Sequence, residues 1–200
     1  MTIEKFILWI TVMAPVVYSA GPNNLMCASI GARFGFRKSI PFIIGVNSNI
    51  FLYSLLTGFG LGKILESYPG IFSYIKYAGS IYILYLAYRF FRSSGSENAE
   101  EKDTRTPGFW SGIILNSLNP KGFTALLIMY SQFLDEKYPI YSQVFLLAIM
   151  VLIMSVSSHL LWSSGGYWIL GRLTSTRANK IQGILFGSML VVVAAWLLFN

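Results

Sequence analysis

Charged residues are scarce in this sequence, and several long stretches contain none. Only 12% of the 200 residues are charged, against about 25% in a typical soluble domain. No Asp, Glu, Lys or Arg occurs between Lys5 and Arg33, between Lys38 and Lys63, between Lys137 and Arg172, or after Lys180. Because about 20 apolar residues cross a bilayer, each gap is long enough for one membrane-spanning helix. The sequence therefore predicts an integral membrane protein.

Cysteine and histidine are also scarce, with a single residue of each. Cys27 has no disulfide partner within the chain, and thiolate metal sites usually need several cysteines. We expect Cys27 to be a small packing residue, and we expect neither a metal site nor a cofactor. The sequence shows no pairing of carboxylates, or of a nucleophile with a base, at a readable spacing, so it does not indicate an enzyme.

The net charge of +7 does not indicate a nucleic-acid partner, because the basic residues gather in the loops between apolar stretches. Ten Lys and Arg residues fall in the alternate regions 31–39, 89–108 and 167–180, and three fall in the regions on the other side. Since cytoplasmic loops carry the excess of basic residues, both termini are predicted to lie outside. The expected surroundings are a lipid bilayer, and the sequence leaves open whether the protein forms a homo-oligomer.

Six membrane-spanning helices are predicted, over residues 5–30, 40–62, 71–91, 109–134, 140–166 and 181–199. The polar segment 92–108 is rich in small residues and is predicted to be a flexible cytoplasmic linker. It divides the chain into two three-helix units, 1–91 and 109–200. Because each unit has an odd number of helices, the second enters the membrane from the opposite face. The predicted fold is thus all-α, with two inverted three-helix repeats.

The segment YSAGPNN, residues 18–24, follows the N-terminal apolar run and raises the question of a cleaved signal peptide. Cleavage after Ala20 is disfavoured, because Tyr18 is bulky where a small residue is needed. Glu4 also cancels the positive charge of Lys5, which a signal peptide would use. We therefore expect this segment to be a break within a retained helix.

Helices one and four are too long for straight crossings, and each contains a proline near its middle. Twenty-six helical residues run roughly 39 Å, against about 30 Å of hydrocarbon. Proline lacks the N–H donor and disfavours the helical conformation of the residue before it. We predict that helix one breaks at Gly21-Pro22 and helix four at Asn119-Pro120.

The two restarted half-helices are predicted to begin in mid-membrane and to converge on one site. Helix N-termini carry free N–H groups and partial positive charge, which suit an anion such as a carboxylate. Lys121 adds a full charge at a depth where insertion of a charge costs about 3 kcal/mol or more. The predicted substrate-binding residues are Gly21, Pro22, Asn23, Asn24, Asn47, Asn119, Pro120 and Lys121.

Several of these residues also have a purely structural interpretation. Pro22 and Pro120 would then only kink packed helices, and Lys121 would bind backbone carbonyl groups. Asn47 either lines the path or forms a hydrogen bond to a neighbouring helix. His159 is a candidate for proton coupling because histidine titrates near neutral pH, and the simpler interpretation is an interhelical hydrogen bond.

Two segments resemble the signature regions of the LysE/RhtB family of amino-acid exporters. They are GPNNLMCASIGARFGFRKSIPFIIGVN (21–47) and SLNPKGFTALL (117–127). The six predicted helices and the linker between the halves fit the same family, so the resemblance covers essentially the whole chain. It implies a secondary exporter of amino acids or close derivatives in the bacterial cytoplasmic membrane, driven by the proton gradient.

The chain departs from the family pattern at two places. It has Ala20-Gly21-Pro22 where the family usually has Pro-Gly-Pro, so the break is expected to rest on Gly21-Pro22 alone. Lysine-exporting members carry an acidic residue near the start of helix two, where this chain has NSN at 47–49. With no carboxylate inside a predicted helix, a neutral substrate such as homoserine, threonine, cysteine, leucine or a derivative is favoured. The alternative is an exporter of inorganic or metal ions on the same fold.

Overall fold

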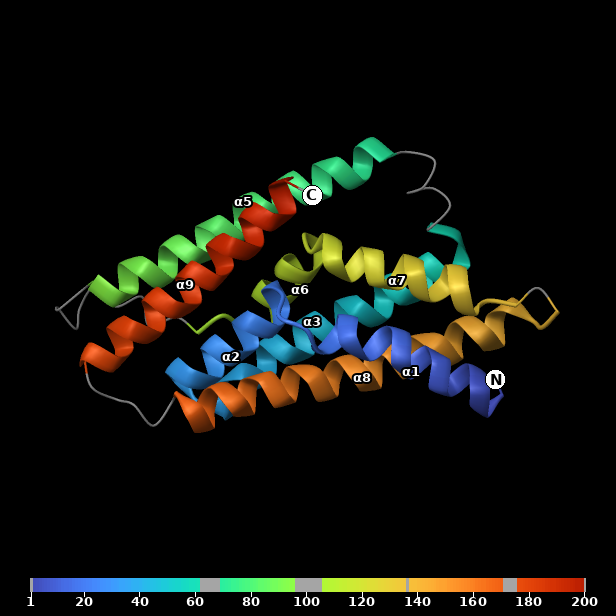
Figure 1. Ribbon diagram of the computed structural model, residues 1–200, viewed down its shortest axis with the longest axis horizontal. Coiled ribbons are helices and arrows are strands. Elements are labelled where there is room, and N and C mark those ends of the chain that lie inside the picture. The colour runs from blue at the N-terminus through green and yellow to red at the C-terminus, as the bar shows by residue number, and fades with distance from the viewer. Residues whose placement is uncertain (1, 62–68, 96–105, 136, 171–175, 200) are drawn as a thin grey trace.

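The described part of the molecule is helical and elongated (Figure 1). The computed structural model describes residues 2–61, 69–95, 106–135, 137–170 and 176–199, and no strand occurs within these ranges. The predicted all-helical class is therefore confirmed for this part of the chain. The helices are α1 (Ile3–Tyr18), α2 (Pro22–Phe34), α3 (Phe36–Leu56), α5 (Pro69–Gly95), α6 (Phe109–Ser117), α7 (Pro120–Phe133), α8 (Ile140–Ile169) and α9 (Thr176–Phe199), with a short π-helical turn η1 (Thr57–Leu61) after α3.

Two helical stretches in the described ranges, Phe36–Gly60 and Ile140–Ile169, are long and apolar enough to cross a membrane. The pair α1 and α2 adds a third crossing if it is counted as one span, with a bend of 57° between its halves. The apolar part of α9, Lys180–Trp196, is shorter. The structure thus supports helical membrane spans, and the number of six crossings stays a prediction.

Both predicted helix breaks are present. α1 ends at Tyr18 and α2 begins at Pro22, and α6 ends at Ser117 and α7 begins at Pro120. Each proline is the first residue of its new helix, where its missing N–H group would have had no helical partner. The two starts differ, because the Asn119 side chain accepts a hydrogen bond at the start of α7, whereas no side chain caps α2.

Several predicted boundaries were wrong. The loop expected at 31–39 is a single residue, Gly35, at a φ of 91°. Glycine adopts this left-handed region without steric cost, so the chain turns there and α2 and α3 nearly touch end to end. α5 extends to Gly95, into the predicted linker, and residues 96–105 of that linker lie outside the described residues. Glu4 falls in the first turn of α1, so one carboxylate does lie in a helix, at the end of α1 away from the break.

Two pairs of helices approach each other closely at glycines on both partners. Gly31 of α2 faces the carbonyl group of Ser163, and Gly166 of α8 faces that of Ala28. A Cβ atom at either glycine would overlap the facing carbonyl group. α3 and α6 repeat the arrangement. Gly45 of α3 faces the carbonyl group of Phe109, and Gly112 of α6 faces that of Phe42. Small residues permit such close approach. In Figure 1 α2 lies beside α8 toward the left, and α6 lies beside α3 near the centre.

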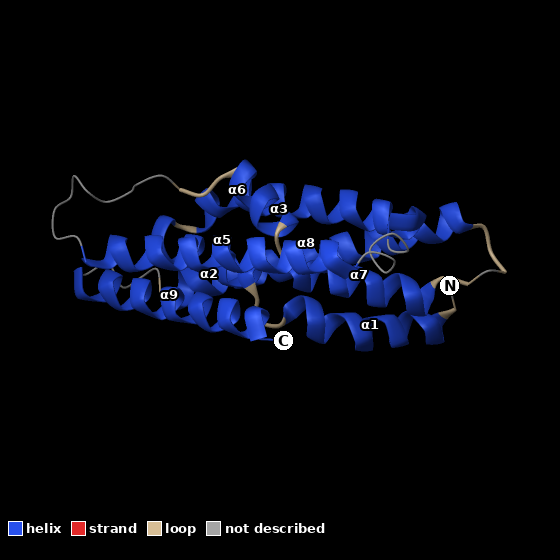
Figure 2. Ribbon diagram, turned by 90° about the horizontal axis from the view of Figure 1, so that it is seen from above, coloured by secondary structure: helices blue, strands red, loops and turns tan. Residues whose placement is uncertain are grey.

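The hydrophobic core has two parts. One cluster joins α2, α3, α5, α6 and α9 and includes Phe42, Ile83 and Leu190. The other joins α1, α7 and α8 and includes Met13 and Met129. In Figure 2 the first cluster's helices α2 and α9 lie toward the left, and α1 and α7 lie toward the right.

An ion pair joins the start of α1 to the connection between α7 and α8. Lys5 Nζ donates to Asp135 Oδ2 at 2.9 Å. This hydrogen bond, followed by one from the backbone N–H of Lys137, lowers the pKa of the Asp135 carboxyl below its usual 3.8. A lowered carboxyl pKa stabilises the fold above the unfolded-state pKa, and this contribution is lost as pH falls through the folded-state value.

We expect Asp135→Asn to lower the melting temperature slightly at pH 7, because the pair is exposed and screened. The difference from the unmodified protein should shrink as the pH falls from 3.8 toward about 3, because protonation begins to remove the charge of Asp135 there. Thermal unfolding of both proteins in detergent at the two pH values measures this. A difference that grows on acidification would contradict the assignment.

Candidate functional site

The break between α1 and α2 leaves backbone carbonyl groups without helical partners, and side chains from α8 and α2 donate hydrogen bonds to them. Trp162 Nε1 donates to the Tyr18 carbonyl at 3.0 Å, and Ser158 Oγ donates to the Val17 carbonyl at 3.1 Å. Asn24 Nδ2 also donates to the Val17 carbonyl, at 2.9 Å. Inside a bilayer no water is present to satisfy such groups. These contacts therefore satisfy carbonyl groups that a bilayer would leave without partners.

Lys121, at the start of α7, completes the binding of this break. Its Nζ donates to the Ser19 carbonyl at 3.1 Å, to Ser19 Oγ at 2.9 Å and to the Ala20 carbonyl at 3.4 Å. The ammonium group thus sits against the negative end of the α1 dipole. It is also close to Gly21, where a Cβ atom would lie 3.0 Å from Nζ. The start of α7 and the break before α2 are therefore in direct contact.

A chain of amide hydrogen bonds links α2, α6 and α3. Asn23 Nδ2 donates to Asn116 Oδ1 at 2.8 Å, and Asn116 Nδ2 donates to Asn49 Oδ1 at 2.6 Å. Asn49 Nδ2 continues the chain to Ser117 Oγ at 3.2 Å. Asn23 Oδ1 is buried and has no hydrogen-bond partner in the described part of the molecule. The chain holds both helix breaks in register and leaves one acceptor unused.

His159 of α8 lies at the other end of this polar region. Its Nδ1 is 3.1 Å from Asn47 Nδ2 on α3 and 3.4 Å from Ser155 Oγ on α8. The side chain is buried, at 4% exposed. The interhelical hydrogen bond weighed from the sequence is thus present, and it involves Asn47.

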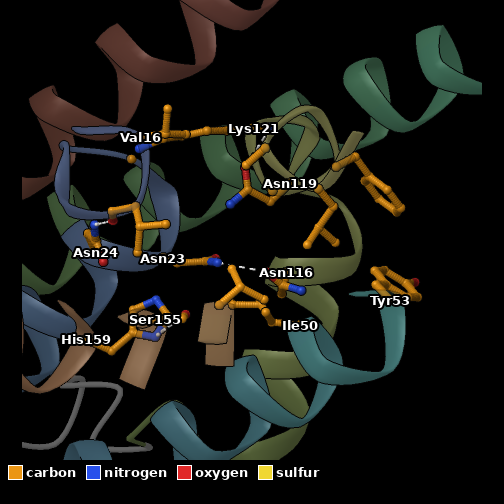
Figure 3. A pocket seen from close by; sticks show the side chains of 17 residues that line it. Val16, Asn23, Asn24, Ile50, Tyr53, Asn116, Asn119, Lys121, Ser155 and His159 are labelled. Carbon is orange, nitrogen blue, oxygen red and sulfur yellow. Dashed lines mark hydrogen bonds between the residues drawn. The ribbon is translucent and has the colours of Figure 1, made fainter. Parts of the chain in front are cut away.

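These groups surround a cavity of about 70 Å³. Residues at the two helix breaks form part of its wall, and Lys121 and His159 lie near opposite ends (Figure 3). The apolar part of the wall includes Ile50, Tyr53, Phe123, Leu126 and Val151. No Asp or Glu lies among its lining residues in the described part of the chain. Small-molecule pockets usually have about 300 Å³ or more, so this cavity must widen to take an amino acid.

A larger groove of about 840 Å³, here called the outer groove, lies next to the cavity and is also lined by Lys121. It runs between α1, α7 and the last turns of α9, where Trp196 lines it. Figure 2 shows α9 ending at the level of the α1–α2 break. The two spaces are adjacent, because both are lined by Val16, Gly21, Lys121 and Ala125.

Residues 10–200 of the chain match one family model, described as LysE type translocator. The chain belongs to the LysE type translocator family. It is therefore a member of a family of membrane transporters for amino-acid efflux, and the resemblance seen in the sequence is confirmed.

Curated relatives of this translocator are similar over most of their length. The homoserine/homoserine lactone efflux protein of Salmonella typhimurium is 22% identical, with 98% of this chain and 97% of the relative aligned. An uncharacterized membrane protein of Vibrio cholerae is 25% identical over 90% of this chain and 92% of the relative. The cysteine/O-acetylserine efflux protein of Salmonella typhimurium is 28% identical over 74% of each chain. No solved structure matches this chain.

Most of the residues predicted for the translocator's site do lie together. The cavity is lined by Gly21, Asn23, Asn24, Asn119, Lys121 and His159. Pro22 and Pro120 line the outer groove instead. Asn47 is absent from the cavity wall and reaches the site only through His159.

Sequence reasoning missed Asn116 and Ser155, which also line the cavity. Asn116 carried a usable signal, because it is a buried polar residue one turn before the Asn119-Pro120 break. Ser155 lies one helical turn before His159, so the two face the same side of α8. Among the described residues, no group of three His, Cys, Asp or Glu side chains could hold a metal ion.

Proposed function

We propose that this translocator is a secondary active exporter of small, neutral amino acids or close derivatives from the bacterial cytoplasm. One observation carries the proposal: the starts of α2 and α7 and the ammonium group of Lys121 meet in a single cavity. Helix N-termini and the half-buried ammonium group of Lys121 favour an anion. The carboxylate of an amino acid is the anion that suits a site at this depth.

The rest of the wall favours a neutral side chain. It offers amides, a hydroxyl, an imidazole and an apolar surface that includes Ile50 and Leu126. A cationic side chain would need an acidic partner in the cavity. Relatives are named for export of homoserine, homoserine lactone, cysteine and O-acetylserine, whose side chains are uncharged.

Alternating access accounts for the uneven packing of the bundle. α2 has extensive contacts with α8, and α6 with α3, whereas α1 and α7 contact their neighbours sparsely. The proposed topology of six crossings in two inverted units, 1–91 and 109–200, puts the basic ends of α2 and α3 in the cytoplasm of a bacterial inner membrane and both termini outside. The half of the bundle that holds the α2–α8 and α3–α6 crossings is then the cytoplasmic gate, in its closed state.

Coupling to the proton gradient follows from the family resemblance. One proton moving inward provides about 2.3 kcal/mol per 100 mV of membrane potential, enough for modest uphill export. Export of inorganic or metal ions is the weaker alternative, because such ions favour carboxylates, thiolates or clustered imidazoles.

Proteoliposomes preloaded with labelled amino acids test the function. We expect efflux of at least one neutral amino acid, accelerated by an inward proton gradient, and no efflux of lysine. Protein-free liposomes provide the control for leakage. Efflux no faster than from protein-free liposomes, for every amino acid tested, would remove the proposed function and leave only the family and the helical fold.

A further inference from the structure

The hydrogen bonds of Asn47 determine which of its atoms faces His159. Asn47 Nδ2 donates to the Ile43 carbonyl, one helical turn earlier in α3, at 2.8 Å. Only the amide nitrogen can do this, because the amide oxygen has no proton to donate. The same nitrogen is 3.1 Å from His159 Nδ1. The orientation of the Asn47 amide is therefore set by its own helix.

It follows that His159 Nδ1 accepts a hydrogen bond and carries no proton. A neutral imidazole with an accepting Nδ1 has its proton on Nε2. Ser155 Oγ, 3.4 Å from the same Nδ1, is a hydroxyl that can also donate to it. Lys121, a cation, lines the same cavity, and no carboxylate lines it in the described part of the chain. Nothing there stabilises a second positive charge on the ring.

The remaining ring nitrogen is available to a ligand. Within the described part of the chain, His159 Nε2 takes part in none of the hydrogen bonds, although the residue is only 4% exposed and lines the cavity. Nε2 is not one of the fully enclosed polar atoms without a partner, so it is accessible to the space that a ligand would occupy. Figure 3 shows Lys121 and His159 near opposite ends of the cavity, with Asn23 between them.

We propose that Asn47 is a positioning residue that holds His159 as the neutral Nε2–H tautomer, and that this N–H group binds an oxygen atom of the substrate side chain. The identity of the substrate rests on the proposed function, in which Lys121 takes the carboxylate. An amino acid held at that end extends its side chain toward His159. The site then favours side chains with a hydroxyl or carbonyl oxygen, and His159 does not carry the coupled proton.

The tautomer can be measured directly, because the chain has a single histidine. Purified protein in lipid, labelled with ¹³C and ¹⁵N at histidine, should give the signature of a neutral ring protonated at Nε2 at pH 7. Asn47→Asp places an acceptor against Nδ1 and should move the proton there or charge the ring. Gln132→Glu, the same chemical change at an exposed position of α7, should leave the spectrum unchanged. A wild-type ring that is charged, or protonated at Nδ1, would overturn the proposal.

Transport of a matched pair of substrates tests the role of the N–H group. Homoserine and 2-aminobutyrate differ only by one hydroxyl group. We expect wild type to prefer homoserine, and His159→Leu to raise the KM for homoserine about tenfold, the size of a lost hydrogen bond to substrate, while changing that for 2-aminobutyrate much less. His159→Gln, whose amide can donate from a similar position, should restore the preference and keep proton flux.

Loss of proton-coupled export in His159→Gln, with exchange of substrate preserved, would show that His159 carries the proton and would refute the proposal. Equal KM changes for the two substrates would refute it as well. If wild type moves neither compound nor any other amino acid, the proposed function fails and the substrate contact fails with it. The spectrum would still decide whether Asn47 sets the tautomer.

Discussion

Lys121→Ala is expected to lower the rate of amino-acid efflux by roughly 100-fold or more. A charge-assisted contact to the bound carboxylate contributes about 3 kcal/mol when one partner is removed, which corresponds to this factor. The same change also removes the donor to the Ser19 and Ala20 carbonyl groups. Initial efflux rates from proteoliposomes, with substrate concentration varied, give both KM and the maximal rate. Lys137→Ala, an exposed lysine in the α7–α8 connection, is the matched control and should transport normally.

A second set of variants separates substrate binding by Lys121 from its contact with the end of α1. Lys121→Met keeps the length of the side chain without the charge, and Lys121→Arg keeps the charge. If the ammonium binds the carboxylate, the arginine variant retains part of the activity. Amino-acid methyl esters, which lack the carboxylate, should then be poor ligands for wild type. Normal efflux by Lys121→Met would contradict the carboxylate assignment and leave Lys121 as a partner of backbone carbonyl groups.

The helix breaks could be predicted from the sequence because their cause is local. Pro22 and Pro120 remove a backbone donor wherever they stand, and each begins a new helix in the structure. Lys121 was found by the same kind of argument, since a lysine in mid-membrane is costly in any fold. Its neighbour Asn119 was identifiable as a cap, because Asn is favoured at that position.

The contacts that complete the site depend on residues far apart in the chain, and the sequence does not pair them. Asn47 and His159 are 112 positions apart, and Asn23 and Asn116 are 93 apart. From the sequence, Asn47 could line the path or bond a neighbouring helix, and only the packing of α3 on α8 distinguishes these roles. The one-residue turn at Gly35 was missed for a different reason. The basic residues around it predict a longer loop, although Arg33 lies in the last turn of α2, where a cation suits the helix dipole.

The second large effect is expected from a single methyl group at the crossing of α2 and α8. Gly166→Ala should lower the melting temperature by several degrees, because the added Cβ would overlap the Ala28 carbonyl and force the helices apart. Gly165→Ala is the matched control, since a Cβ there meets no atom within 4 Å. Alanine is favoured over glycine in a helix by about 1 kcal/mol, so the control should be unchanged or more stable. Equal loss in both variants would contradict the close crossing.

The lone cysteine reports on the same crossing without further engineering. Cys27 is fully buried on α2, directly before Ala28. Its labelling by a small maleimide should be slow in wild type and Gly165→Ala, and clearly faster in Gly166→Ala, where the helices are parted. Gly31→Ala strains the same crossing from α2, so its effect should add incompletely to that of Gly166→Ala.

The response of wild-type Cys27 to substrate then distinguishes a gate from a fixed joint. If the α2–α8 crossing opens during each cycle of export, substrate on the cytoplasmic side should speed labelling of the unmodified protein, because turnover populates the open state. A fixed joint would label at the same slow rate with and without substrate. In that case the half of the bundle that holds the α2–α8 crossing would move as one body, and access would have to alternate through the sparsely packed helices α1 and α7.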